Sequence, residues 1–145
     1  MRAMPSGYTG PRSPQRPPAA ECGYRHCASV DDLPPGQIER LYKRARLLQS
    51  MLERGIHLPQ TLEHRLGITC FLEPSTRTRV SFEAAALRLG MQLISITAAD
   101  SSLAKGESDR DTRLTLESYW PDALIVRTAE AGLPQRWAMD ATCSV

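Results

Sequence analysis

Hydrophobic residues recur at helical spacing between residues 38 and 52. The apolar positions, at intervals of three and four, are Ile38, Leu41, Ala45, Leu48 and Leu52. Lys and Arg residues occupy positions between them, so the pattern predicts an amphipathic helix with one charged face. Pro34 and Pro35 suit the opening of this helix, because the first N–H groups of a helix have no partner within it, and Gly55 suits its end.

Further along the chain, short apolar runs alternate with helical patterns. In order, the sequence predicts a strand over 67–72, a helix over 77–89, a strand over 91–97, a polar loop over 98–108, a helix over 109–120 and a strand over 122–127. Strands that alternate with helices indicate right-handed βαβ units. The expected fold class is therefore α/β, a parallel sheet with flanking helices.

The two ends of the chain depart from this alternation. Residues 1–27 are rich in Pro, Gly, Ser and Arg and lack periodic apolar positions, so they predict a disordered tail ahead of one domain over 28–145. Residues 129–137 predict the beginning of one more helix. Residues 139–145 offer no further strand, and we expect one edge and part of one apolar face of the sheet to be poorly covered.

Composition narrows the class of protein. The net charge of +2 is too small to indicate a nucleic acid or an acidic membrane as partner, and no apolar run is long enough to span a membrane. The N-terminal residues lack the apolar core of a secretory signal, so we expect a cytoplasmic protein. The cysteines are Cys22, Cys27, Cys70 and Cys143. Their spacing fits no common zinc pattern, so we expect free thiols. We expect no metal and no other cofactor.

Candidate chemistry lies in the segment Phe71–Glu83, which reads Phe-Leu-Glu-Pro-Ser-Thr-Arg-Thr-Arg-Val-Ser-Phe-Glu. It leads from a predicted strand into a predicted helix, whose first turn offers free N–H groups and the positive end of its dipole. Ser75, Thr76 and Thr78 add hydroxyl donors, and Arg77 adds a planar fork suited to phosphate. The alternative is an ordinary serine N-cap followed by solvated arginines.

Three segments together resemble the aspartate/ornithine carbamoyltransferase family. The string Phe71–Glu83 is similar to the family's carbamoyl-phosphate signature, and Glu73-Pro74 is more typical of its aspartate branch than of its ornithine branch. Ser101–Thr112 is similar to the family's mobile loop and the helix that follows. Asp122–Arg127 is similar to its third strand, which ends in an arginine. The resemblance runs from about residue 28 to residue 127.

The resemblance implies roles for individual residues. Residues 75–78 would hold the phosphate of carbamoyl phosphate, and Thr78 and Arg127 would contact the carbamoyl oxygen. The catalytic residues would be Arg77, Thr78 and Arg127, with no cofactor. Ser102 and Lys105 would reach the phosphate bound by a neighbouring subunit, because the family forms homotrimers. The reaction implied is carbamoyl transfer to L-aspartate in pyrimidine biosynthesis.

The chain also departs from the family pattern. It contains no His-Pro-Thr-Gln motif, whose histidine contacts the carbamoyl oxygen, and no second domain for the aspartate. After Gln135 we expect the family pattern to be lost, as in a fragment or after a frameshift, and the chain to be inactive by itself. Three alternatives remain: transfer to ornithine or another amine, a non-catalytic module for carbamoyl-phosphate binding or assembly, and a chain that does not fold stably.

Overall fold

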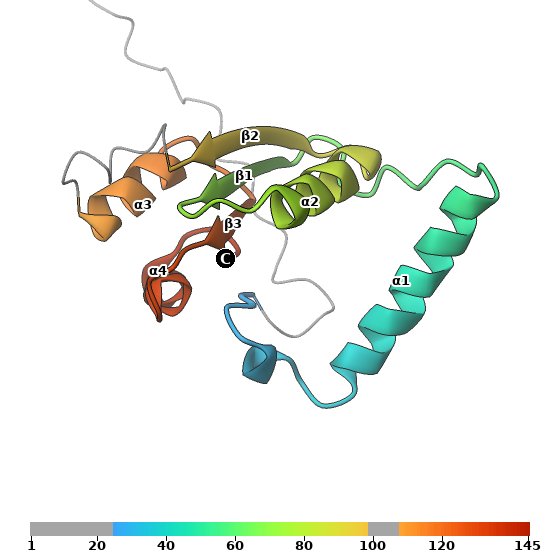
Figure 1. Ribbon diagram of the computed structural model, residues 1–145, viewed down its shortest axis with the longest axis horizontal. Helices are drawn as coiled ribbons and strands as arrows, with labels where there is room; N and C mark the ends of the chain where they lie inside the picture. The colour runs from blue at the N-terminus through green and yellow to red at the C-terminus, as the bar shows by residue number, and fades with distance from the viewer. Residues whose placement is uncertain (1–24, 99–107) are drawn as a thin grey trace, which may run out of the picture.

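The computed structural model describes residues 25–98 and 108–145 (Figure 1). The elements in chain order are η1 (Val30–Asp32), α1 (Gln37–Glu53), β1 (Leu66–Phe71), α2 (Thr76–Arg88), β2 (Gln92–Thr97), α3 (Asp109–Glu117), β3 (Ala123–Arg127) and α4 (Leu133–Asp140). This order confirms the predicted alternation of strands and helices. The expected tail over 1–27 lies outside the described residues as far as residue 24.

The three strands form one parallel sheet in the order β2-β1-β3. Phe71, the last residue of the central strand, is paired with Thr97 on one side and with Arg127 on the other. The carboxyl ends of all three strands therefore lie in one row. This alignment positions the loops that follow the strands along a single edge of the sheet.

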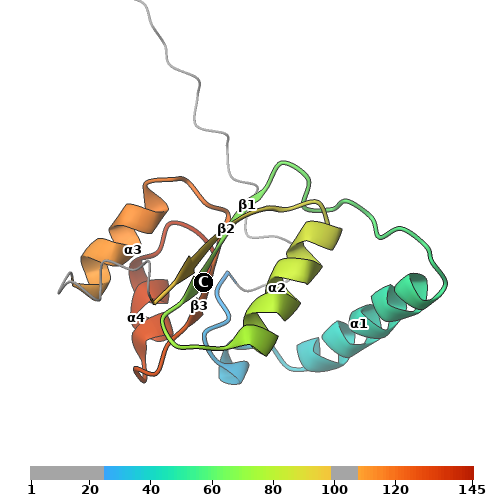
Figure 2. The ribbon, with the colours of Figure 1, turned by 45° about the horizontal axis from the view of Figure 1, so that its top comes forward.

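Helices cover both faces of the sheet. Figure 2 shows the sheet nearly edge-on, with α2 on one side and α3 and α4 on the other. The chain passes from β1 through α2 to the neighbouring β2, and then through α3 across to β3 on the opposite side of β1. The first connection runs from β1 to one side of the sheet, and the second runs from β2 back past β1 to the other side, so a topological switch point lies between the carboxyl ends of β1 and β3.

Helix α1 confirms the predicted amphipathic helix but stands away from the sheet (Figure 1). Ile38, Leu41 and Leu52 on its apolar positions remain 40–46% exposed. The helix begins after Gly36, which adopts a left-handed conformation, so Pro34 and Pro35 precede the helix and do not open it. The sequence pattern thus predicted the helix correctly. The apolar face of α1, however, is not buried against any other described element.

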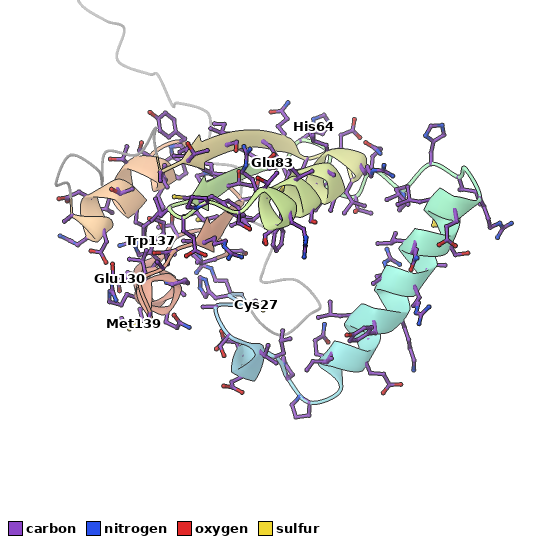
Figure 3. All side chains as sticks on the ribbon, in the orientation of Figure 1. Cys27, His64, Glu83, Glu130, Trp137 and Met139 are labelled. Carbon is purple, nitrogen blue, oxygen red and sulfur yellow. The ribbon has the colours of Figure 1, made fainter. Side chains whose placement is uncertain are left out.

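The core lies between the sheet and the α3–α4 layer. Its buried members are Ile68, Cys70, Leu116, Leu124, Leu133, Trp137 and Cys143. Trp137 is 1% exposed and Met139 is 76% exposed, and Figure 3 labels them on opposite sides of α4. The helix expected to begin within 129–137 is therefore an integral part of the core.

The C-terminal residues make a short contact with β3. Ser144 forms a parallel bridge with Ala123, its N–H donates to the Asp122 carbonyl, and its carbonyl accepts from Leu124 N–H at 2.7 Å. Cys143 is fully buried. As the sequence predicts, residues 139–145 form no further strand, and the contact with β3 is a single isolated bridge.

The first described residues make hydrogen bonds to the last residues of the chain. Cys27 N–H donates to the Val145 carbonyl at 2.7 Å, and Val145 N–H donates to Nδ1 of His26 at 3.3 Å. Arg25 also donates to the carbonyl of Thr142. Residues 25–27 are thus held by partners more than 100 residues away, which no local sequence pattern reveals. No helix in the described part of the chain is long and apolar enough to cross a membrane.

Candidate functional site

The corner between β1 and α2 holds the residues that the sequence singled out. β1 ends at Phe71, and Leu72 N–H makes one more backbone hydrogen bond to the Arg127 carbonyl at 2.8 Å. Pro74 has no N–H and cannot continue the ladder, and Ser75 takes the N-cap position of α2. The corner thereby places the first turn of α2 at the carboxyl edge of the sheet.

The Ser75 hydroxyl makes no capping hydrogen bond to its own helix. By contrast, the hydroxyls of Ser29 and Ser108, at the N-caps of η1 and α3, accept from the N–H groups of Asp31 and Asp111. An ordinary serine cap would satisfy one of the free N–H groups in the same way. Ser75 therefore occupies the N-cap position without using its hydroxyl as a cap, which leaves the first N–H groups of α2 available to a ligand or to water.

The charge distribution of the first turn favours an anion. α1 has Glu39 in its first turn and α3 has Asp109 and Asp111, whereas α2 has no acidic residue there. The first turn of α2 instead contains Arg77. The partial positive charge at this helix start is thus reinforced by a cation and not neutralised by a carboxylate.

Arg127 reaches across from the end of β3 to this corner. Its Nη1 donates to Thr78 Oγ1 at 3.1 Å, and its Nε donates to Glu73 Oε1 at 2.6 Å. The side chains of Arg127 and Glu73 are 41% and 29% exposed, so the ion pair faces solvent on one side. The structure brings together Thr78 and Arg127, which are 49 residues apart in the sequence. They meet at the switch point between β1 and β3, where open α/β sheets bind ligands.

The Thr78 hydroxyl is oriented by this contact. Its oxygen accepts from Arg127, so its own proton is available to donate to a further acceptor. Among the described residues, Nη2 of Arg127 has no hydrogen-bond partner. The pair can therefore offer at least two converging donors to one oxygen atom or to neighbouring oxygen atoms of a ligand.

A hollow of about 370 Å³ opens on the β2 side of the same corner. Its polar walls are Glu73, Ser75, Thr76, Arg79 and Thr97. It lies at the carboxyl ends of β1 and β2, directly beside the start of α2. Hydroxyls and a guanidinium thus border one open space beside the start of α2, together with the Glu73 carboxylate and the apolar Phe71, Pro74 and Ala98. Hydroxyls and a guanidinium are groups that suit a small anion such as a phosphate.

The remaining predicted site residues are placed as follows. Arg77 is exposed on the first turn of α2, and its guanidinium has no hydrogen-bond or ion-pair partner in the described part of the chain. Ser102 and Lys105 lie outside the described residues. Of the seven residues predicted, five are described, and all five lie at the carboxyl edge of the sheet.

Sequence reasoning missed three residues at the corner. The sequence indicates Glu73 only as a marker of the aspartate branch, although its carboxylate accepts a hydrogen bond from Arg127 Nε. Arg79 and Glu83 were not assigned any role, although Arg79 borders the hollow. Their spacing of four on a predicted helix was a usable signal, because side chains at i and i+4 are neighbours on a helix surface.

Within 25–98 and 108–145, no group of three His, Cys, Asp or Glu side chains is arranged to hold a metal ion. Cys70 and Cys143 are buried free thiols, and Cys27 is exposed. Burial raises the pKa of the Cys70 thiol to about 11. A thiol reacts as its thiolate, so Cys70 is poorly reactive near neutral pH.

Alkylation of the native chain should follow this difference. At pH 8, iodoacetamide is expected to modify Cys27 and to leave Cys70 unmodified, and mass spectrometry of the digested protein would locate the label. Unfolding in urea before the treatment is the control and should make Cys70 reactive. Labelling of Cys70 in the native protein at the rate of Cys27 would contradict the burial described above.

The comparisons with known proteins agree with this geometry. A family model described as aspartate/ornithine carbamoyltransferase, carbamoyl-P binding domain, matches residues 25–145. The match extends to the last residue, so the expectation that the family pattern is lost after Gln135 was wrong. In the structure, these last residues contact the sheet through the parallel bridge between Ser144 and Ala123.

Relatives share a substantial part of the sequence. The aspartate carbamoyltransferase catalytic subunit of Nocardioides sp. is 44% identical over 114 residues, which cover 79% of this chain and 35% of the relative. The corresponding subunit of Thermus thermophilus is 42% identical over 120 residues, which cover 81% of this chain and 40% of the relative. The chain thus spans well under half the length of the curated relatives it matches.

Solved structures show the same fold. Aspartate transcarbamoylase from Trypanosoma cruzi, in complex with carbamoyl phosphate and aspartate, matches with a TM-score of 0.76 and 30% identity over 88% of this chain and 39% of that chain. Ornithine carbamoyltransferase from Pyrococcus furiosus matches with a TM-score of 0.74 and 30% identity over 83% of this chain and 38% of that chain.

Proposed function

Because the chain belongs to the aspartate/ornithine carbamoyltransferase family, we propose that the corner between β1 and α2 binds carbamoyl phosphate for transfer of the carbamoyl group to an amine. The observation that carries this proposal is the meeting of Arg127 with Thr78 beside a helix start whose N-cap hydroxyl is unused. Ser75, Thr76 and the first N–H groups of α2 would hold the phosphate, with Arg77 as the added cation.

The arrangement suits a reaction that needs no protein nucleophile. The acceptor amine attacks the carbamoyl carbon, negative charge develops on the carbamoyl oxygen, and the bond to phosphate breaks. The protein has to position the donor and to stabilise the developing charge, for which fixed cations and hydroxyl donors suffice. In this proposal Thr78 and Arg127 donate to the carbamoyl oxygen, while the first turn of α2 stabilises the departing phosphate.

We further propose that the acceptor is L-aspartate, in de novo pyrimidine biosynthesis in the cytoplasm. The support is that the curated relatives reported above are named aspartate carbamoyltransferases and that Glu73-Pro74 resembles the aspartate branch. Ornithine is the competing acceptor, since an ornithine carbamoyltransferase matches the fold equally well. Incubating the protein with carbamoyl phosphate and either amine, with detection sensitive enough for slow turnover, and identifying the carbamoylated product would decide between them.

Two additional proposals concern this 145-residue chain as it stands. We expect assembly into a homotrimer in which Ser102 and Lys105 reach the site of a neighbouring subunit. We also expect the chain alone to bind the donor without useful catalysis, because its sequence lacks the His-Pro-Thr-Gln motif. Loss of one donor to the transition state typically costs about 10²–10³ in rate. Formation of carbamoyl-aspartate by the purified 145-residue chain would contradict this second proposal.

Calorimetric titration with carbamoyl phosphate tests the binding proposal. Wild-type protein is expected to bind, and Arg77→Ala is expected to weaken binding about tenfold, because a hydrogen bond to a charged group is lost. Arg88→Ala is the matched control, since it removes the same charge from the other end of the same helix. It should bind like the wild type. Absence of binding by the wild type, or equal loss in both variants, would refute the proposed site.

A further inference from the structure

A polar network lies between α2 and the sheet, one turn beyond the residues of the proposed phosphate site. Ser95 Oγ on β2 donates to Glu83 Oε1 at 2.6 Å, and Thr69 Oγ1 on β1 lies 3.1 Å from both of these oxygens. Thr69 is fully buried in the central strand. Figure 3 labels Glu83 where α2 faces the sheet. One carboxylate oxygen therefore ties the helix to two strands at once.

Arg79 connects this network to the hollow. It lies one turn before Glu83 on α2, and its Nη1 is 3.8 Å from Glu83 Oε1 and 3.4 Å from Ser95 Oγ. The same side chain borders the hollow together with Ser75 and Thr76, and it is 35% exposed. Of the three guanidinium nitrogens of Arg79, only Nη1 has partners among the described residues. The donors on Nε and Nη2 therefore remain for a ligand.

An ordinary surface ion pair is the competing explanation. Lys43 and Glu39 form such a pair on α1 at the same spacing, but their side chains are 75% and 71% exposed and neither is tied to the sheet. Such surface pairs contribute little to the stability of the fold, because both side chains lose mobility and gain only a weak interaction in water. Glu83 differs, since it is 22% exposed and is held by a buried hydroxyl from another element.

The charges around the hollow also favour Arg79 as a ligand group. Glu73 borders the hollow, but its carboxylate is paired with Arg127 at 2.6 Å. Glu83 is only 3.8 Å from Arg79, beyond hydrogen-bonding distance for those two atoms, and its nearer partners are hydroxyls. The Glu83 carboxylate thus attracts the Arg79 guanidinium without accepting a hydrogen bond from it. An anion in the hollow would find donors that are already oriented.

We propose that Arg79 is a further binding residue for the phosphate of the donor, and that Glu83, held by Thr69 and Ser95, is the positioning residue that directs Arg79 toward the hollow. The inference rests on the proposed function, because it assigns two additional residues to the same anion site. Arg79 contacts the ligand, whereas Glu83 acts only through Arg79. The ligand class it implies for this wall of the hollow is a small dianionic phosphate.

A double-mutant cycle tests both roles. Wild type, Arg79→Gln, Glu83→Gln and the double variant would be titrated with carbamoyl phosphate and, separately, with inorganic phosphate. Arg79→Gln should weaken binding of both ligands about tenfold, since a charge-assisted hydrogen bond is lost. Glu83→Gln should weaken binding roughly threefold when Arg79 is present and should not weaken it further in the Arg79→Gln protein, because coupled residues do not act additively.

The controls separate positioning from structural support. Arg79→Lys keeps the charge and should retain most of the affinity, and raising the ionic strength should weaken binding less in Arg79→Gln than in the wild type. Thermal unfolding of each variant would show whether the fold is intact. Equal weakening by Glu83→Gln in both backgrounds would indicate a structural effect and overturn the positioning role. Tighter binding by Glu83→Gln alone would overturn it as well.

Failure of this inference can be distinguished from failure of the proposed function. If the wild type binds carbamoyl phosphate, Arg77→Ala weakens binding and Arg79→Gln binds within about twofold of the wild type, only the role of Arg79 is refuted. If the wild type binds neither ligand, the proposed function fails, and the assignment of Arg79 and Glu83 fails with it.

Discussion

Arg127→Ala is expected to weaken carbamoyl phosphate binding by about a hundredfold or more, because it removes one partner of a partly desolvated ion pair. The wild-type guanidinium donates to Thr78 Oγ1 and to Glu73 Oε1. In the proposed site, truncation would remove the cation that faces the donor and would leave the Glu73 carboxylate, which is 29% exposed, unpaired beside the dianion. Repulsion by this carboxylate adds to the loss of the hydrogen bonds.

A second substitution separates these two contributions. Glu73→Gln in the Arg127→Ala protein removes the unpaired negative charge, so the double variant should bind more tightly than Arg127→Ala alone. Glu73→Gln in the otherwise wild-type protein keeps Arg127 and should not weaken binding. Calorimetric titration of all four proteins would measure the coupling between the two positions. Equal affinity of Arg127→Ala and the double variant would show that the Glu73 carboxylate does not repel the donor.

The second large effect concerns stability. Arg113→Met is expected to reduce the free energy of unfolding by about 3–5 kcal/mol, because it leaves the carboxylate of Glu117 buried without its partner. The two side chains are each 6% exposed, and Arg113 Nη1 lies 3.0 Å from Glu117 Oε2. The pair also joins α3 to the C-terminal segment, since Arg113 donates to the carbonyl of Asp140 and Glu117 accepts from Thr142 N–H.

Urea unfolding of a matched set of proteins would check this expectation. In the double variant with Arg113→Met and Glu117→Leu, no charge remains unpaired, so its loss of stability should be smaller than the sum of the two single losses. The exposed pair on α1 supplies the control, and Lys43→Ala should cost no more than about 0.5 kcal/mol. Losses that simply add in the double variant would show that Arg113 and Glu117 do not act as a pair.

The sequence predicted most elements because their patterns are local. The run 67–72 and the helical spacing after it placed β1 and α2 within one residue of their observed ends. α3 ends at Glu117, three residues before the predicted end. Trp120, which has a positive φ, lies in the turn that follows. The hydrophobic spacing continues through this turn, and no Gly or Pro within 118–120 marks where the helix ends. The end of α3 was therefore predicted less accurately than its start.

The contacts that the sequence patterns did not predict join residues that are distant along the chain. His26 meets Val145, and Ser144 pairs with Ala123, although neither contact has a local signature. The ion pair of Glu73 with Arg127 joins residues 54 positions apart. Only the parallel register, which aligns Phe71 with Arg127, brings these side chains together.

The sequence by itself determined the α/β class, the order of its elements and the residue types that follow β1, because helical and strand periods and a strand-to-helix string are properties of neighbouring residues. The tertiary structure alone decided which hydroxyls and cations lie together. Ser75 makes no capping hydrogen bond, Arg127 donates to Thr78, and Arg79 borders the hollow one helical turn from Glu83. Each of these depends on strand order and register, which set distances between residues that the linear sequence keeps apart.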